Sequence, residues 1–551
     1  MNILWFMCDQ LRYDYLGCAG HPHIRTPNFD SVAAKGVRFN HAYCQSPKCG
    51  PSRMSAYTGR YVRSHGASTN FAALRVGEPT LGDHLITVGV DPVLIGKTHM
   101  NADVEGMKRL GIDEGSDIGI RTAECGFIPY VRDDGLHPHV GKDDPDYFEY
   151  VRSHGYEADN PWADLANAAE DENGNVVSGW FMRHARKPAR IPAHLSESAY
   201  ITDRTLQFMQ GTLKDRPWVA HVSYIKPHWP FIAPAPYNDM YDSSQVLPAV
   251  REDHELAPRN SVVRSFQNEK YSTAFHRQEV RDTVIPTYMG LITQIDDEIG
   301  RILDYLKESG QDKDTMIILS SDHGDYLGDH WLSEKQLFHD PSVRVPLIIY
   351  DPRDEANKTR GTISDTLVEL IDVAPTILEV YSGTPLPHIF EGESLIPALH
   401  SGSNTLRDYV VSECDYSEDN ARRDLKHGPR ECKIRMIADK RWKLVQYEKD
   451  YPQLFDRLND PNELTDIAIE REHQDVLLDM HNKLFEWARN PKANICTSDT
   501  RITQSDEAWK FYDSRALAGF PIGYWSEDEF EREVKARSAF LKKKCEEIKE
   551  P

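Results

Sequence analysis

The sequence has no long apolar run, no closely spaced pair of cysteines and no basic stretch that offsets its acidic residues. Because no segment is apolar over the length that a bilayer requires and no signal peptide is visible, we expect no membrane partner. A formal net charge of −23 argues against a nucleic-acid partner. The nine cysteines are scattered without Cys-x-x-Cys spacing, which is typical of reduced thiols and indicates a cytoplasmic protein.

Apolar segments of strand length alternate with helical patterns along much of the 551 residues. Residues 2–7, 218–224 and 316–319 are nearly continuous apolar runs, as in buried parallel strands. Residues 288–306 repeat apolar side chains at spacings of three and four, which predicts a long amphipathic helix closed by Gly310. The alternation predicts an α/β protein with a mostly parallel sheet.

A short helix is predicted to begin near Cys49, in the segment Cys-Gly-Pro-Ser-Arg at 49–53. Pro51 suits a first helical turn, and Gly59 suits the left-handed position after the last turn. Cys49 would then lie at a helix N-terminus, where free N–H groups favour an anion, and Arg53 would follow one turn later on the same face. A half-buried cysteine capping an ordinary helix is the alternative interpretation.

Polar side chains follow two of the predicted strands. Asp9 and Gln10 come after residues 2–7, and Asp322 and His323 come after residues 316–319. Open α/β sheets place ligands at the carboxyl ends of their strands, so these residues are candidate ligands. Helix caps or turn residues are the plainer alternative for the two aspartates.

Basic side chains follow other strand-like segments. Lys97 and His99 end a short apolar run, and residues two apart on extended backbone point the same way, so both could line one wall. His228 lies in a proline-rich turn after residues 218–224, and Lys335 follows the Asp322 segment. Surface solvation or simple packing would also account for each of them singly.

Taken in order, these segments resemble the type I, formylglycine-dependent sulfatases of the alkaline phosphatase superfamily, close to the branch of arylsulfatases and phosphonate monoester hydrolases. The resemblance covers roughly residues 1–470. The sulfatase motif usually has Leu where this chain has Ala56. The matching segments are Cys-x-Pro-Ser-Arg at 49–53, Gly-Lys-x-His at 96–99, Lys-Pro-His-x-Pro-Phe at 226–231, Ser-Asp-His-Gly at 321–324 and Leu-Gly-Asp-His at 327–330 with Lys335.

The resemblance implies an alkaline-phosphatase-like fold, with a large mixed, mostly parallel sheet between helices and a smaller C-terminal antiparallel-sheet domain. We expect a catalytic domain over 1–404, in which 101–195 forms an insertion on the substrate side, and a small domain over 405–490. Residues 491–551 form a charged tail. Its aromatic residues predict self-association as a homodimer or larger: Phe511, Tyr512, Phe520, Tyr524 and Trp525.

The resemblance also implies the cofactors and the site. Cys49 would be oxidised to formylglycine (3-oxoalanine) by a formylglycine-generating or sulfatase-maturing enzyme, a further expected partner. One divalent cation, calcium or manganese, is expected because the set mixes oxygen ligands with an imidazole. Its ligands would be Asp9, Gln10, Cys49, Asp322 and His323.

The implied reaction is hydrolysis of a small-molecule sulfate monoester, of aryl sulfate type, by the hydrated aldehyde. Arg53, Lys97 and Lys335 would neutralise negative charge, and Lys335 or His228 would assist the leaving alcohol. His99 would act as the base that releases sulfate. We also expect side activity toward phosphoesters and phosphonates.

Two alternatives remain open from the sequence. One is a phosphonate monoester hydrolase or phosphodiesterase on the same scaffold, and the other is an inactive binding protein with the same fold. Phosphonate monoester hydrolases tend to carry Tyr and Thr at the positions that match Lys97 and His99, so the Lys and His here favour a sulfatase.

Overall fold

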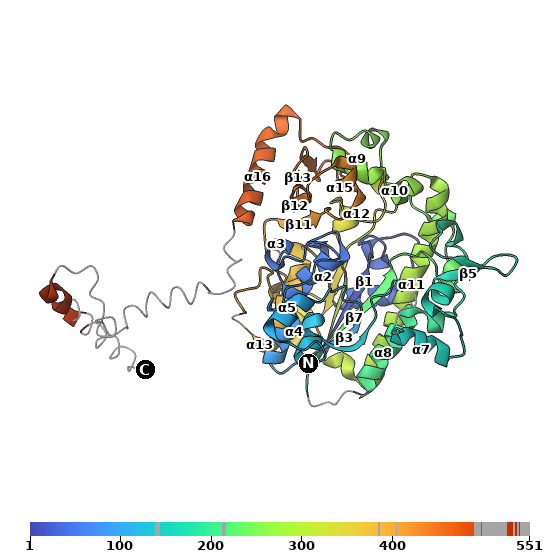
Figure 1. Cartoon of the computed structure of the whole chain (residues 1–551), viewed down its shortest axis with the longest axis horizontal. Coiled ribbons are helices and arrows are strands. Elements are labelled where there is room, and N and C mark those ends of the chain that lie inside the picture. Colours follow the sequence, from blue (N-terminus) through green and yellow to red (C-terminus); the bar gives the residue numbers. More distant parts are fainter. Residues whose placement is uncertain are drawn as a thin grey trace. The chain divides into compact units, whose positions relative to one another are not determined.

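The computed structural model describes residues 1–137, 144–211, 216–383, 386–403 and 405–489, together with 498, 526–532, 535, 536 and 539. The chain folds into two compact units (Figure 1). The first unit contains Met1–Leu386 and Phe390–Arg489. The second contains Pro387–Ile389 with Asn490–Pro551. The five aromatic residues of the predicted tail surface lie outside the described residues. The structure of the first unit is described below.

An eight-stranded sheet forms the centre of the first unit, in the order β10-β2-β9-β8-β1-β7-β3-β4. Neighbouring strands run parallel except at β9, which is antiparallel to both β8 and β2. The mostly parallel sheet predicted from the apolar runs is therefore confirmed. The strands are β1 (Asn2–Asp9), β2 (Val37–Tyr43), β3 (Asp91–Gly96), β4 (Ile128–Arg132), β7 (Trp218–Pro227), β8 (Thr315–Ser321), β9 (Leu347–Tyr350) and β10 (Thr362–Glu369).

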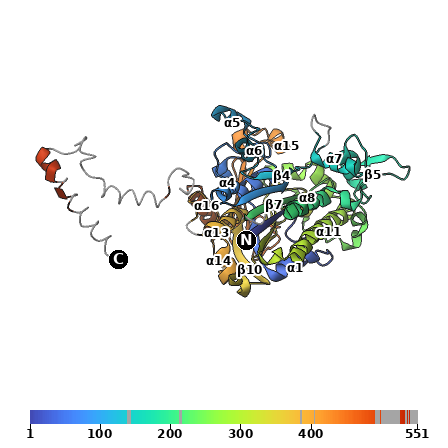
Figure 2. The same ribbon diagram turned by 90° about the horizontal axis from the view of Figure 1, so that it is seen from below.

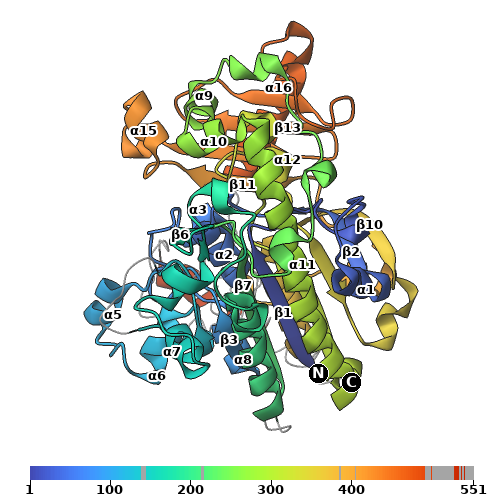
Figure 3. The ribbon, with the colours of Figure 1, turned by 90° about the vertical axis from the view of Figure 1, so that its right-hand side faces the viewer.

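Helices cover both faces of this sheet (Figures 1 and 2). Successive side chains of a strand point to opposite faces, so Ile3, Trp5 and Met7 belong to one core cluster and Leu4 and Phe6 to the other. The Trp5 face packs against α2 (Cys49–Thr58), α4 (Leu81–Thr87) and α13 (Val373–Ser382). The Phe6 face packs against α1 (Pro27–Lys35), α8 (Glu197–Gly211) and the long helix α11 (Gln278–Ser309), which runs beside β1 in Figure 3.

A second, antiparallel sheet follows near the C-terminal end of the unit, in the order β11-β12-β13-β14. Helix α16 (Gln474–Ala488) covers it, and Met480 and Leu484 of this helix share a core with Ile437 and Leu444 of the sheet. β12 and β13 form the central antiparallel pair of this sheet. The strands are β11 (Val410–Asp415), β12 (Lys433–Ala438), β13 (Trp442–Tyr447) and β14 (Gln453–Asp456).

The range 101–195, in which the sequence shows no long periodic segment, contains short elements. β4 lies within it and extends the main sheet at one edge. Among its described residues are also α5 (Val104–Leu110), α6 (Asp117–Ala123), α7 (Asp146–Ser153) and the small hairpin of β5 (Ala168–Glu170) and β6 (Val176–Ser178).

Short helices connect the remaining segments. In the part of the chain that the structure describes, no helix combines the length and apolarity needed to cross a bilayer. The connecting helices are α3 (Val62–His65), α9 (Ser261–Gln267), α10 (Lys270–Phe275), α12 (Asp340–Val343), α14 (Ile396–Ser401) and α15 (Asn420–Leu425).

Candidate active site

The carboxyl ends of four neighbouring parallel strands meet at one edge of the main sheet. Asp9 is the last residue of β1, and Asp322 directly follows β8, which pairs with it. His228 follows β7, and Lys97 follows β3. Parallel pairing places all four ends on the same side, so the candidate residues from distant parts of the sequence lie close together.

Helix α2 points its N-terminus at this edge. It begins at Cys49 and ends at Thr58. The following residue, Gly59, has the left-handed φ of 64° expected directly after the last turn. Pro51 lies in the first turn, as predicted, and every residue of α2 is buried. The backbone N–H of Gly50 donates to the Asn70 side-chain oxygen at 3.0 Å, which fixes the entrance to the helix.

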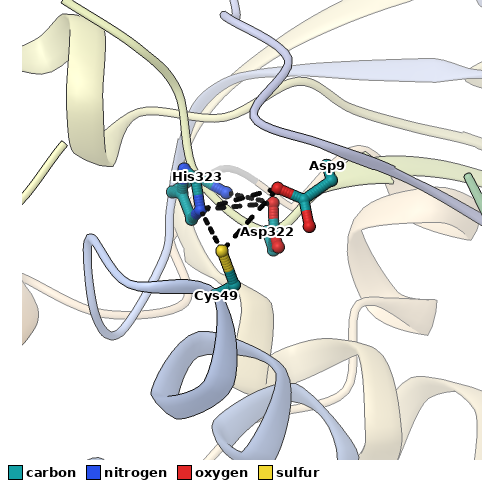
Figure 4. Close-up of side chains that lie close together, drawn as sticks. All are labelled: Asp9, Cys49, Asp322 and His323. Carbon is teal, nitrogen blue, oxygen red and sulfur yellow. Dashed lines mark hydrogen bonds and ion pairs between the residues drawn. The ribbon is translucent and has the colours of Figure 1, made fainter. Parts of the chain in front are cut away.

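Four potential ligands converge at the helix N-terminus (Figure 4). The ligand atoms of Asp9, Cys49, Asp322 and His323 all lie within 4.8 Å of one another, and all four residues are buried. Cys49 Sγ lies 3.1 Å from His323 Nε2 and 3.7 Å from Asp9 Oδ1. His323 Nδ1 donates to the Gly324 carbonyl at 2.9 Å, which leaves Nε2 directed at the cluster. Two carboxylates and an imidazole fit a divalent cation.

Arg53 forms a bridge between the carboxylates of Asp9 and Asp322. It donates to Asp322 at 2.8 Å and to Asp9 at 3.2 Å, and all three side chains are fully buried. Its other contacts, to the Lys97 carbonyl at 2.9 Å and Ser223 Oγ at 2.7 Å, hold the guanidinium in one orientation. Arg53 therefore balances the charge of the buried acids and sets their positions.

Two lysines complete the positive charge around Cys49. Lys97 Nζ forms an ion pair with Asp9 at 2.7 Å. Lys335 Nζ lies 3.2 Å from Cys49 Sγ and 3.0 Å from the Gln10 side-chain oxygen. Burial opposes ionisation of Cys49, but Lys335, His323 and Lys97 together lower the pKa of its thiol well below the ordinary value. The site thus stabilises negative charge on the side chain at position 49.

Gln10 lies beside the cluster, between two other side chains. Its amide oxygen accepts from Lys335, and its amide nitrogen donates to Asp325. Its backbone N–H donates to Asp322 Oδ1 at 3.0 Å. In this arrangement Gln10 orients Lys335 and Asp322.

His228 faces Cys49 from the end of β7. Its Nδ1 donates to the Trp229 carbonyl at 2.8 Å. The ring also forms a hydrogen bond with the Cys49 side chain. Burial, with a smaller contribution from Lys335, lowers the pKa of His228 to about 4. The imidazole is therefore neutral near pH 7 in this structure.

His99 is placed differently from the expectation. β3 ends at Gly96, and both Gly96 and His99 have positive φ, of 110° and 53°, so the extended backbone assumed for residues 97–99 is not present. The backbone N–H of His99 donates to Asp134 at 2.9 Å, and among the described residues its buried Nδ1 has no hydrogen-bond partner. Its ring shares no hydrogen bond or ion pair with Cys49 in the described part of the chain.

The sequence analysis did not identify two further residues of the site, Asp325 and Glu334. Asp325 is fully buried and accepts from Gln10 and from the Glu334 backbone N–H at 3.0 Å. Burial raises the pKa of Glu334, which precedes Lys335, to about 7. Their positions in the sequence, directly beside the Asp322-His323 segment and Lys335, could have indicated that they belong to the site.

Comparisons with known proteins agree with this geometry. The family model described as Sulfatase matches residues 1–383, and the model of the N-sulphoglucosamine sulphohydrolase C-terminal region matches residues 328–490. The multifunctional alkaline phosphatase superfamily protein PehA of Trinickia caryophylli is 32% identical over 88% of this chain and 95% of its own length. An arylsulfatase of Clostridium perfringens is 29% identical over 86% of this chain and 91% of its own length.

Solved structures show the same likeness. The phosphonate monoester hydrolase of Silicibacter pomeroyi superposes with a TM-score of 0.78 at 27% identity, over 90% of this chain and 97% of its own. That of Agrobacterium radiobacter superposes with a TM-score of 0.75 at 26% identity, over 88% of this chain and 95% of its own. The chain belongs to the sulfatase family of the alkaline phosphatase superfamily, in the branch that includes arylsulfatases and phosphonate monoester hydrolases.

Proposed function

We propose that this protein hydrolyses sulfate monoesters to an alcohol and sulfate, using formylglycine formed from Cys49 and one divalent cation, calcium or manganese. The observation that carries the proposal is the position of Cys49. It begins a buried helix within the Cys-x-Pro-Ser-Arg segment and lies 3.1 Å from His323 and 3.2 Å from Lys335. Cys49 Sγ marks where the attacking oxygen would lie.

Two groups would bring chemistry that the chain itself lacks. Hydrated formylglycine supplies a nucleophilic hydroxyl and, through its second hydroxyl, a route of release that serine does not have. A divalent cation held by Asp9, Gln10, Asp322, His323 and the modified Cys49 would supply positive charge beside that hydroxyl.

Arg53 and Lys97 would act through the carboxylates that they contact. Four of the five N–H groups of the Arg53 guanidinium donate to protein acceptors, so we expect its role to be positioning Asp9 and Asp322. Lys97 balances Asp9 in the same way, at 2.7 Å.

Lys335 and His228 are the groups placed to contact the ester. Lys335 Nζ, at 3.2 Å from Cys49 Sγ, would bind an ester oxygen and stabilise the charge that develops there. Lys335, whose ammonium carries protons, would give one to the leaving alcohol, whereas His228, neutral with its single proton on Nδ1, would assist in this way only after taking up a proton. His99, whose Nδ1 has no partner among the described residues, would remove a proton during release of sulfate after a change of ring orientation.

Peptide mass spectrometry tests the modification. In protein from a host that modifies sulfatases, the peptide containing Cys49 should lose one sulfur and two hydrogens and gain one oxygen. Cys44 provides an internal control, because it is buried nearby but lies outside the Cys-x-Pro-Ser-Arg segment. Fully active protein with an unmodified Cys49 would rule the mechanism out.

A phosphonate monoester hydrolase is the second candidate. It is favoured by the likeness to the two phosphonate monoester hydrolase structures, whereas Lys97 and His99 favour the sulfatase. The test compares kcat/KM for matched aryl sulfate and aryl phosphonate esters, with the Lys97→Ala and His99→Ala variants alongside. We expect the sulfate to be preferred, with measurable turnover of the phosphonate. Preference for the phosphonate, or wild-type sulfate turnover by both variants, would contradict the sulfatase assignment.

A further inference from the structure

A small apolar pocket lies beside the candidate active site. It has a volume of about 140 Å³. A cavity of roughly 150 Å³ lined by apolar side chains is large enough to hold benzene. The pocket is therefore the size of one aromatic ring. Its lining combines three segments of the chain: Gly179, Trp180 and Met182; Trp229, Pro230 and Phe231; and Tyr271 with Ser333 and Glu334.

The walls of this pocket are aromatic faces. Trp180 and Trp229 lie with ring centroids 5.1 Å apart and inclined at 53°. Trp180 remains 44% exposed although it is large and apolar, so part of its ring is open to a ligand. Such faces favour another planar ring, which would gain both apolar burial and aromatic contact.

The inner end of the pocket adjoins residues already placed around Cys49. Trp229 follows His228, and their ring centroids are 4.4 Å apart. Glu334 precedes Lys335, whose amine lies 3.2 Å from Cys49 Sγ. A group that leaves the ester on the side of His228 and Lys335 would therefore enter this pocket.

The outer end adjoins a larger, basic basin of about 700 Å³. Trp180, Met182 and Tyr271 line both cavities, so the two lie side by side. Arg183, Lys270 and Arg277 line the basin with a single acid, Glu279. None of the three basic side chains forms an ion pair with a described residue. On a chain of formal net charge −23, this excess of positive charge is a local exception.

We propose that the pocket and basin form a leaving-group subsite for sulfate esters of aromatic alcohols that carry a second anionic group on the far side of the ring. The proposal rests on the proposed function and adds the class of alcohol to it. Arg183, Lys270 and Arg277 attract a carboxylate at the outer end, whereas the pocket lining at the inner end, which includes Glu334, offers no positive charge. This charge distribution sets the direction in which the alcohol binds.

The kinetic test uses two sulfate esters of the same shape, 4-carboxyphenyl sulfate and 4-carbamoylphenyl sulfate. We expect the ratio of kcat/KM for the charged ester to that for the neutral ester to be about fivefold higher in the wild-type enzyme than in the Lys270→Gln/Arg277→Gln variant, since two exposed charge contacts contribute about 1 kcal/mol together. This comparison cancels the different acidities of the two alcohols, and added salt should reduce the difference. Trp180→Ala should lower kcat/KM for both esters by about tenfold.

The matched control is Lys307→Gln/Lys313→Gln, which removes two exposed lysines from outside both cavities. It should keep the wild-type preference, and thermal unfolding should show that every variant folds. An unchanged ratio of the two kcat/KM values in the Lys270→Gln/Arg277→Gln variant would overturn the subsite.

Calorimetric binding of the product alcohols separates this inference from the proposed function. The wild-type protein should bind 4-hydroxybenzoate more tightly than 4-hydroxybenzamide, and the Lys270→Gln/Arg277→Gln variant should not. If the enzyme hydrolyses neither ester but shows this difference in binding, the proposed function is wrong and the subsite stands. Hydrolysis without any effect of these variants on the ratio or on binding would leave the function and reject the subsite.

Discussion

At the scale of single residues, the site depends on charge balance among buried groups. Asp9 and Asp322 are fully buried, and the cost of burying two carboxylates is offset by Arg53 and Lys97. Arg53 donates hydrogen bonds to both acids, so it sets their separation as well as balancing their charge. Lys335 is free of carboxylate contacts in the described structure and points its amine at Cys49 instead.

Replacement of Arg53 by Met should therefore destabilise the protein. The change keeps much of the side-chain volume but leaves two buried acids short of a partner, and we expect the free energy of unfolding to fall by about 3–5 kcal/mol. Calcium or manganese should then raise the melting temperature more than in the wild type, because added positive charge replaces the guanidinium. Urea unfolding and thermal scans with and without each ion measure both effects.

Arg109→Met is the control for this substitution, because Arg109 is exposed on α5. It should change neither the free energy of unfolding nor the response to metal ions. An Arg53→Met protein as stable as the wild type would show that the two carboxylates do not depend on the guanidinium.

At the scale of elements, α3 supports α2 from behind the site. His65, at the end of α3, is buried, and its Nε2 lies 2.9 Å from Ser55 Oγ of α2. Its Nδ1 accepts from the backbone N–H of Ala67 at 3.2 Å, which requires that nitrogen to be unprotonated. Burial lowers the pKa of His65 to about 3, with Arg60 contributing further.

This shift makes stability depend on pH in a defined direction. Because the folded protein holds His65 neutral while the unfolded chain takes up a proton below about pH 6.5, the contribution is fully present above that pH and is lost as pH falls from 6.5 toward 3. The loss is about 1.4 kcal/mol per pH unit. His65→Gln should reduce the pH dependence of the free energy of unfolding by this amount, measured with urea at pH 7, 6 and 5.

His23→Gln is the matched control, since His23 is exposed. Its unfolding free energy should keep the wild-type pH dependence over the same range. The explanation fails if His65→Gln retains the full wild-type slope between pH 6 and pH 5.

At the scale of the whole first unit, a buried ion cluster joins the two sheets. Lys443 of β13 is fully buried and lies 2.7 Å from Asp340 of α12 and 2.5 Å from Glu463. Arg457 approaches the same two acids at 2.9 and 3.3 Å. Because α12 follows the Lys335 segment closely in sequence, the small sheet helps to hold the part of the chain that carries Lys335.

The cluster predicts that both sheets unfold together. Lys443→Met should lower the free energy of unfolding by about 3 kcal/mol, because it leaves buried acids with one partner fewer. Unfolding of residues 1–489 should remain a single transition in calorimetry. Lys440→Met, in the turn of the same hairpin and exposed, should have no effect. Separate transitions for the two sheets, or an unchanged stability of Lys443→Met, would argue against this coupling.

Much of the fold and part of the site were predictable because they depend on local patterns. Apolar runs predicted β1, β7 and β8, the three- and four-residue spacing predicted the core of α11, and Pro51 with Gly59 predicted both ends of α2. Each pattern reflects the period of a strand or helix or the backbone preference of a single residue. The polar residues that follow β1 and β8 then predicted one edge of the sheet as the place of the site.

The sequence by itself thus determined the central strands β1, β7 and β8, the helices α2 and α11, the family resemblance and most of the residues gathered around Cys49. The tertiary structure alone decided the strand order, the antiparallel direction of β9, the bridging role of Arg53 and the aromatic pocket formed by residues 179–182, 229–231, 271 and 333–334. It also placed His99 on left-handed backbone rather than on a strand. The physical reason is that apolar burial has no preferred direction or partner, so a local pattern shows that a side chain is buried but not against what.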